Sequence, residues 1–162
     1  MGKNDGEVMA QVQWFPGHMA KTKRLIAENL KKVDVVIEVL DARAPRASAN
    51  PLLRKLTASK PRLVLLNKDD LADPEATELW MSHFSGAGDV LRVSAASRRG
   101  LNGIAPACRK LCRNTRALER RPVRALIAGI PNAGKSTIIN ALSRERKAEA
   151  GARPGLTRDL RR

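Results

Sequence analysis

The sequence has few aromatic residues, only two cysteines and no apolar run long enough to cross a membrane. The aromatic residues Trp14, Phe15, Trp80 and Phe84 are too few for the base-stacking surfaces of RRM or OB domains. Two cysteines cannot form a disulfide scaffold, so we expect a reduced, cytoplasmic protein. No stretch of about 18 apolar residues occurs, so no membrane span is expected, and residues 1–7 lack the apolar core of a signal peptide.

Positive charge is in large excess. The 162 residues include 31 Lys and Arg against 16 Asp and Glu, a formal charge of +15. Such a charge favours a polyanionic partner, most simply RNA rather than DNA, although Arg-rich helices that only face solvent are the alternative. The length suits one domain.

Four short aliphatic runs predict strands, at residues 33–40, 63–66, 90–93 and 123–128. Each run is nearly continuous rather than alternating, as expected for strands that are covered on both faces of a parallel sheet. Helical spacing lies between them, at residues 19–33, 51–56, 74–84, 100–118 and 135–142. The alternation predicts a doubly wound α/β domain with a mostly parallel sheet.

Two of these helices carry more specific expectations. Asp73 and Pro74 are typical of an N-cap and a first helical position, and Leu79, Trp80 and His83 are placed to pack. Cys108 and Cys112 lie four residues apart on one helix face without further ligands, which predicts core thiols rather than a metal site.

The segment Gly129-Ile-Pro-Asn-Ala-Gly134-Lys135-Ser136 matches the phosphate-loop pattern G-x-x-x-x-G-K-[ST]. It follows a predicted strand and opens a predicted helix, which is the context that the pattern requires. Backbone N–H groups and the helix N-terminus attract phosphate oxygens, the lysine contacts the β- and γ-phosphates, and the serine hydroxyl is offered to Mg²⁺. The expected phosphate-binding residues are Asn132, Ala133, Gly134, Lys135, Ser136 and Thr137, of which Ser136 is also the expected Mg²⁺ ligand.

A second loop predicts guanine recognition. Asn67-Lys68-Asp69-Asp70 follows the run 63–66, at the strand edge where ligands bind in open α/β sheets. Guanine presents two adjacent donors, which the two oxygens of Asp70 can accept together, whereas adenine lacks this pair. Asn67 can tie loops together and Lys68 can cover the base. Ser94 and Ala95 end the next strand, where a backbone N–H can approach the guanine oxygen.

The order of these motifs is rotated relative to most small GTPases, in which the phosphate loop comes first. Here the guanine loop comes first, then Ser94-Ala95, then the phosphate loop. Because all these loops follow parallel strands, they meet at one sheet edge whatever the chain order. The motif order therefore indicates a circularly permuted GTPase domain of the P-loop NTPase type.

With this order and the segment Trp14-Phe-Pro-Gly-His18-Met19, the sequence closely resembles the ribosome biogenesis GTPase A family of the YlqF/RbgA type. Asp41-Ala-Arg43-Ala-Pro45 and Pro154-Gly155-Leu156-Thr157 resemble further segments of that family. The resemblance implies a GTPase that binds GTP or GDP with Mg²⁺ and acts on the large ribosomal subunit, its rRNA and proteins, late in assembly.

The resemblance also implies roles for two residues outside the loops. His18 would help the attacking water, and Thr157, in switch I, would complete the Mg²⁺ shell with Ser136. A His that only satisfies its loop and an ordinary threonine are the structural alternatives. Asp41 and Arg43 are expected to brace the end of their strand.

The expected domain division is an N-terminal tail at residues 1–13 and a circularly permuted GTPase domain at 14–162. No Asp-x-x-Gly follows Thr157, so the domain is expected to lack the switch II segment and the family's C-terminal RNA-binding domain. The phosphate-loop strand is therefore expected at an exposed sheet edge, with weak nucleotide binding and poor hydrolysis.

Two other functions stay open. A basic ribosome- or RNA-binding module with an inactive GTPase centre would explain the charge. An ATP-dependent P-loop enzyme would explain the phosphate loop, although the Asn67–Asp70 loop argues against it.

Overall fold

The computed structural model describes residues 7–13, 19–86, 88–114 and 121–149, and centres on a five-stranded sheet. The strand order is β1-β5-β2-β3-β4, and every neighbouring pair runs parallel. The predicted α/β class and parallel sheet are confirmed. The strands are β1 (Glu7–Gln13), β2 (Val35–Asp41), β3 (Arg62–Asn67), β4 (Asp89–Arg92) and β5 (Arg124–Gly129).

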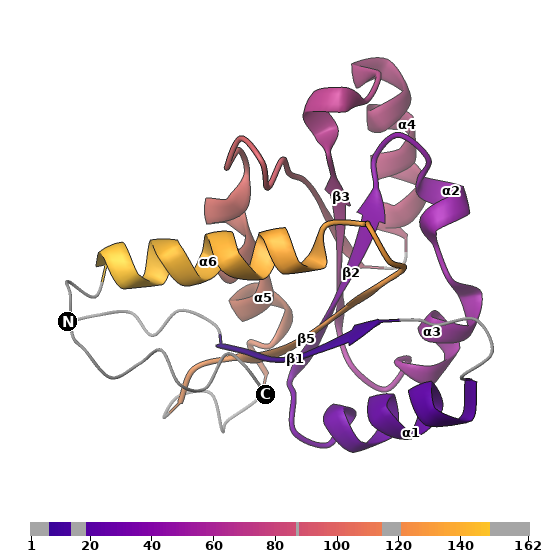
Figure 1. Cartoon of the computed structure of the whole chain (residues 1–162), viewed down its shortest axis with the longest axis vertical. Helices are drawn as coiled ribbons and strands as arrows, with labels where there is room; N and C mark the ends of the chain where they lie inside the picture. Colours follow the sequence, from indigo (N-terminus) through magenta and orange to yellow (C-terminus); the bar gives the residue numbers. More distant parts are fainter. Residues whose placement is uncertain (1–6, 14–18, 87, 115–120, 150–162) are drawn as a thin grey trace.

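Helices cover both faces of this sheet (Figure 1). Helices α5 and α6 lie on one face, and α1 to α4 lie on the other. There are also two short 3₁₀ turns in the described residues. η1 (Asp69–Leu71) follows β3, and η2 (Leu101–Gly103) comes directly before α5. The helices are α1 (Met19–Leu30), α2 (Pro45–Ser48), α3 (Pro51–Leu56), α4 (Pro74–Ser85), α5 (Ile104–Leu111) and α6 (Lys135–Glu149).

The core is aliphatic and double-sided, because the inner strands bury both rows of side chains. Alternate residues of β2 point to opposite faces: Val35, Ile37 and Val39 pack with α5 and α6, whereas Val36 packs with α1 and α3. Leu40 joins Phe84 of α4 in a third cluster. Cys108 and Cys112 are buried free thiols in the first cluster, as predicted, and burial raises the pKa of Cys108 to about 12.

The predicted exposure of the phosphate-loop strand is wrong. β5 is an inner strand that pairs with β2 on one side and with β1 on the other. β1 comes from residues 7–13, within the expected N-terminal tail of residues 1–13. Its register runs from Glu7 opposite Arg124 to Gln13 opposite Gly129, with one irregularity between Val8 and Ala10. The backbone groups of β5 are therefore paired on both sides.

Three smaller expectations also need correction. The helix predicted over 100–118 ends at Leu111, and α6 continues to Glu149 rather than residue 142. Leu79 is 74% exposed because it lies on the outer face of α4, whereas Trp80 stacks on Phe84. His83 is exposed but forms T-shaped contacts with both aromatic rings. Asp73 is the predicted N-cap: its Oδ1 accepts from the Ala76 N–H at 2.8 Å.

Candidate nucleotide-binding site

The predicted nucleotide loops converge at the carboxyl edge of the sheet. Asn67 ends β3, Ser94 and Ala95 follow β4, and the phosphate loop follows β5. β2 lies between β5 and β3, and its last residue is Asp41. Because these strands run parallel, residues more than 60 positions apart in the chain come into hydrogen-bond contact here.

Asn67 connects three loops through its side chain. Its Nδ2 donates to the Ala133 carbonyl of the phosphate loop at 2.9 Å, and its Oδ1 accepts from the Ala95 N–H at 3.1 Å. Asn67 is only 3% exposed. Both partners are buried backbone groups, which would cost stability if left unpaired. One amide side chain therefore sets the distance between the phosphate loop and the Ser94–Ala95 turn.

Gly134 lets Asn67 make this connection. Its φ of +101° lies in the left-handed region, and a Cβ at this position would stand 2.1 Å from Asn67 Nδ2. No real Cβ approaches a heavy atom so closely. Glycine is thus required for two independent reasons, the backbone angle and the space that Asn67 occupies.

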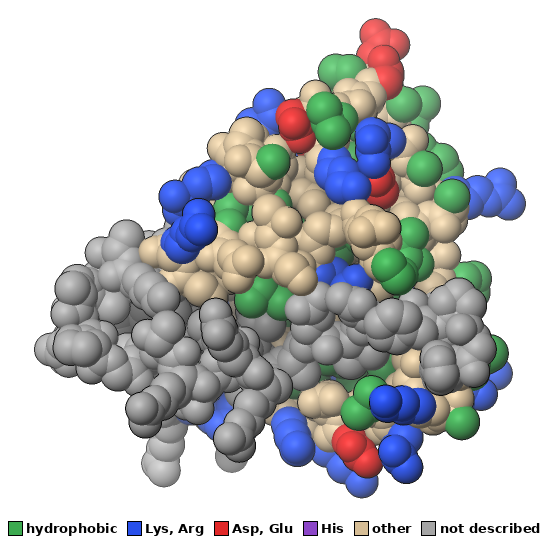
Figure 2. All heavy atoms as spheres, in the orientation of Figure 1, with side chains coloured by type: hydrophobic (Ala, Val, Ile, Leu, Met, Phe, Trp, Pro, Cys, Tyr) green, Lys and Arg blue, Asp and Glu red, His purple; other side chains and the backbone are tan. Residues whose placement is uncertain are grey.

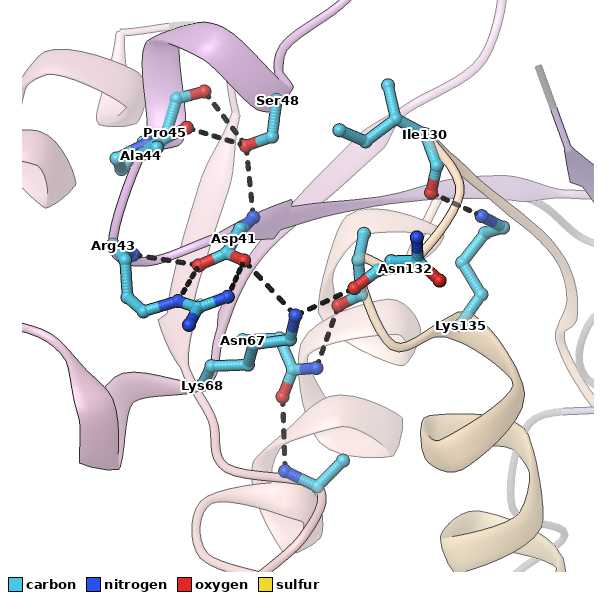
Figure 3. A network of polar contacts seen from close by, with 12 residues as sticks. Asp41, Arg43, Ala44, Pro45, Ser48, Asn67, Lys68, Ile130, Asn132 and Lys135 are labelled. Atoms are coloured by element: carbon cyan, nitrogen blue, oxygen red, sulfur yellow. Dashed lines mark hydrogen bonds and ion pairs between the residues drawn. The ribbon is translucent and has the colours of Figure 1, made fainter. Parts of the chain in front are cut away.

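The side chain of Lys68 reaches from the guanine loop to the phosphate loop (Figure 3). Its Nζ donates to Asp41 Oδ2 at 3.1 Å and to the Asn132 carbonyl at 2.7 Å. The Arg43 guanidinium pairs with the same carboxylate, Nε to Oδ1 at 3.0 Å and Nη2 to Oδ2 at 2.8 Å. Hydrogen bonds from Arg43, followed by those from Lys68, hold the pKa of Asp41 far below its usual value despite partial burial.

The contact between Asp41 and Lys68 adds to the expected strand-end brace of Asp41 and Arg43. No sequence pattern connects an acid and a lysine 27 positions apart, and only the pairing of β2 with β3, which sets Asp41 opposite Asn67, makes them neighbours.

Lys135 is buried within the phosphate loop. It is 3% exposed, and its Nζ donates to the carbonyls of Gly129 at 3.0 Å and Ile130 at 2.6 Å. Burial lowers the pKa of this amine from 10.5 to about 8. An ammonium group has three donors, so one N–H remains for a phosphate oxygen. Lys135 starts α6, whose first-turn N–H groups have no acceptor within the helix.

The remaining predicted residues line the same edge with different exposures. Asp70 is exposed, whereas Ser94 and Ala95 are buried. Ser136 and Thr137 are exposed in the first turn of α6, and Asn132 is exposed with a φ of 65°. Asp70, Ser136 and Thr137, which are expected to meet a ligand, thus face solvent, whereas Lys135 and the bracing residue Asn67 are buried.

Sequence reasoning missed Asp69, the variable position of the guanine loop. Asp69 is 7% exposed and pairs with Arg92 and Arg99. An acid at this position carries no sequence signal of its own, because its partners become neighbours only through the pairing of β3 with β4.

His18 and Thr157 lie outside the described residues. Their expected roles in water activation and Mg²⁺ binding stay predictions.

Known proteins match this chain over most of its length. Residues 124–162, which include the phosphate loop, match a family described as 50S ribosome-binding GTPase. Ribosome biogenesis GTPase A of Bacillus cereus is 45% identical over 153 residues, covering 90% of this chain and 52% of that protein. Its counterpart in Thermotoga maritima is 38% identical over 92% of this chain and 52% of that protein. The chain is a homologue of ribosome biogenesis GTPase A.

A solved structure supports this relationship at the level of the fold. The crystal structure of GNP-bound YlqF from T. maritima superimposes with a TM-score of 0.58 and 35% identity, over 75% of this chain and 47% of that one. This homologue of ribosome biogenesis GTPase A therefore has the α/β fold of a circularly permuted GTPase. It spans about half the length of the curated relatives that it matches.

The described part of the chain contains neither a candidate membrane span nor a candidate metal cluster. None of its helices is both long and apolar enough to cross a membrane. Within the same residues, no three or more His, Cys, Asp or Glu side chains form a group suited to a metal ion.

Proposed function

We propose that this chain binds guanine nucleotides, hydrolyses GTP and acts in late assembly of the large ribosomal subunit. The observation that carries the proposal is the direct connection of the guanine loop to the phosphate loop. Asn67 and Lys68 both donate to carbonyls of residues 132–133, so the base end and the phosphate end of one site are held at a set distance.

Guanine would be recognised by Asp70 and the Ser94–Ala95 turn. Asp70 is exposed and presents two acceptors to the two adjacent donors of guanine. Adenine would leave this carboxylate without a matching donor pair, which is the kind of mismatch that gives strong discrimination. The stem of Lys68 would lie over the base while Asp41 holds its amine.

The phosphates would bind at the N-terminus of α6. The first-turn N–H groups of Gly134 to Thr137 and the Lys135 amine supply positive potential there. Mg²⁺ prefers oxygen ligands, so the exposed Ser136 hydroxyl at this helix start suits it. Thr157 is the second proposed protein ligand and His18 the proposed helper for the attacking water, by resemblance.

A ribosomal partner is supported by the relatives and by charge. One relative, in mouse, is named mitochondrial ribosome-associated GTPase 1, at 37% identity over 90% of this chain and 48% of that protein. Figure 2 shows Lys and Arg side chains along the lower edge of the molecule, over α1. Five basic residues of α1 and the turn after it are exposed: Lys21, Lys23, Arg24, Lys31 and Lys32. We propose rRNA phosphates as their contacts and the cytoplasm as the compartment, where two free thiols persist.

Displacement of a fluorescent GDP analogue in the presence of Mg²⁺ tests the nucleotide proposal. GDP is expected to compete far better than ADP, and Lys135→Met is expected to weaken both. GTP turnover by the same protein, with Lys135→Met as the inactive control, tests hydrolysis. Equal competition by ADP would favour an ATP-dependent enzyme.

Cosedimentation with purified large subunits tests the partner. Binding should fall steeply as salt rises, because phosphate contacts release counterions, and a non-hydrolysable GTP analogue should strengthen it. If neither the bound nucleotide nor Lys135→Met changes the affinity for the large subunit, the result would favour an RNA-binding module without a working GTPase centre.

A further inference from the structure

Asp69 is a buried carboxylate inside the guanine loop that neither the phosphate loop nor the proposed base contacts use. Lys68 adopts a left-handed backbone with a φ of 63°. After this turn Asp69 is 7% exposed, whereas its neighbour Asp70 is exposed. Two adjacent carboxylates thus point in different directions, one into the protein and one to solvent.

Two arginines hold the Asp69 carboxylate, one on each oxygen. Arg92 Nε donates to Oδ1 at 2.9 Å, and Arg99 Nη2 donates to Oδ2 at 2.6 Å. Arg92 also pairs with Glu78 of α4. The Asp69 backbone N–H donates to the Val93 carbonyl at 3.2 Å. Both the main chain and the side chain of Asp69 are therefore tied to the end of β4 and to the segment that follows it.

That segment forms the second loop of the proposed base site. Arg92 ends β4, and Arg99 closes an antiparallel bridge with Ser94 through two backbone hydrogen bonds of 2.9 and 3.0 Å. The turn between Ser94 and Arg99 contains Ala95, whose N–H donates to Asn67. Asn67 and Asp69 thus attach the guanine loop to this turn at two points, on either side of Lys68.

We propose that Asp69 is a positioning residue that sets guanine selectivity, a proposal that rests on the guanine-binding function proposed above. Asp70 can meet two donors of the base only if its orientation is held relative to the Ser94–Ala95 turn. The two ion pairs of Asp69 supply that restraint one residue away, with charge-assisted hydrogen bonds that favour one geometry. The arginines also offset the repulsion between two neighbouring carboxylates.

Competition of GDP, IDP and ADP for a fluorescent guanine nucleotide tests this proposal on the full chain. IDP lacks the 2-amino group, so the ratio of GDP to IDP affinity reports the bidentate contact of Asp70 directly. Asp69→Asn keeps the side-chain shape but removes the charge that holds both arginines. We expect it to lower the GDP to IDP ratio about tenfold, the value of one hydrogen bond to a charged group. ADP affinity, which depends on the phosphate loop, should not change.

Three variants make the result specific. Asp89→Asn removes a carboxylate that pairs with Lys110 at the opposite end of β4, and the GDP to IDP ratio should match the wild type. Arg99→Gln should lower the ratio less than Asp69→Asn, since Arg92 remains. Arg99→Lys should restore most of it, because one N–H still reaches Oδ2.

The outcomes separate the inference from the function on which it rests. Wild-type protein that does not prefer GDP over ADP refutes the proposed function and this inference with it. If wild type prefers GDP but Asp69→Asn keeps the full GDP to IDP ratio, only the inference is overturned. An equal loss of GDP, IDP and ADP binding would show a purely structural role and also overturn it. If circular dichroism shows that Asp69→Asn is unfolded, the variants Arg99→Gln and Arg99→Lys test the inference instead, through their GDP to IDP affinity ratios. Equal ratios in both variants and in wild type would overturn it.

Discussion

The contact between Gly134 and Asn67 yields a prediction with a magnitude worked from the structure. In Gly134→Ala the new methyl carbon would stand 2.1 Å from Asn67 Nδ2, so the amide must leave its position. The Ala133 carbonyl and the Ala95 N–H would then lose their buried partner. Each unpaired backbone group costs about 1–3 kcal/mol, and alanine at a φ of +101° costs about 1–3 kcal/mol more.

The total of about 3–9 kcal/mol is a large part of the stability of an ordinary domain, roughly 5–15 kcal/mol. Urea unfolding followed by circular dichroism measures it. Gly86→Ala is the matched control, because Gly86 has a negative φ of −66° and nothing lies within 4 Å of a Cβ built there. The control should change stability by less than about 1 kcal/mol.

A double-mutant cycle identifies the cause of the loss. Asn67→Ala alone removes the connection and should cost about 2–6 kcal/mol. In that background the methyl group of Gly134→Ala no longer clashes with an amide side chain, so only the backbone cost of about 1–3 kcal/mol should remain. The double variant must therefore lose less than the sum of the single variants. Additive losses, or a Gly134→Ala variant as stable as Gly86→Ala, would refute the reasoning.

Three further predictions concern charge and protonation. Because burial lowers the pKa of Lys135 to about 8 and phosphate needs the charged form, GDP affinity should fall as pH rises from 7 to 9, and calorimetric titration of Lys135→Met should show a flatter profile. The folded chain also binds fewer protons than the unfolded chain between pH 8 and 10.5, so this amine's contribution to unfolding free energy should increase across that window. Asp41→Asn weakens the hold on Lys68 and should lower GDP affinity about three- to tenfold, seen in the same displacement assay, while Asp89→Asn should not. The Cys108 thiol, with its pKa raised to about 12, should react with a disulfide reagent only when urea unfolds the chain, and rapid reaction of the native protein would contradict its burial.

The inner strands were predictable from sequence because each is a continuous aliphatic run covered on both faces. β1 was not, since Glu7–Gln13 has neither a continuous aliphatic run nor a regular polar and apolar alternation, and it is recognisable as a strand only through its pairing with β5. The same limit applies to Leu79: helical spacing gives a face, but only the position of α4 on the sheet decides which face is buried.

The candidate site shows a similar division. Convergence of the loops followed from the parallel sheet, and the residue types of Asn67, Asp70 and Lys135 followed from the ligand's chemistry. The contacts of Asp41 with Lys68 and of Asp69 with Arg92 could not be predicted from either the sheet type or the ligand's chemistry. These pairs join distant segments through strand register, and neither acid occupies a position that the motif specifies.

The most direct test of guanine recognition compares GDP with XDP on the wild-type chain and on Asp70→Asn. Xanthine keeps the N1 donor but presents a carbonyl where guanine presents an amino group, so a carboxylate should repel it and an asparagine amide should match it. We predict that wild type prefers GDP by about a hundredfold or more and that Asp70→Asn prefers XDP. A wild-type chain that binds both equally, or an Asp70→Asn variant that keeps the preference for GDP, would contradict the assignment of this loop.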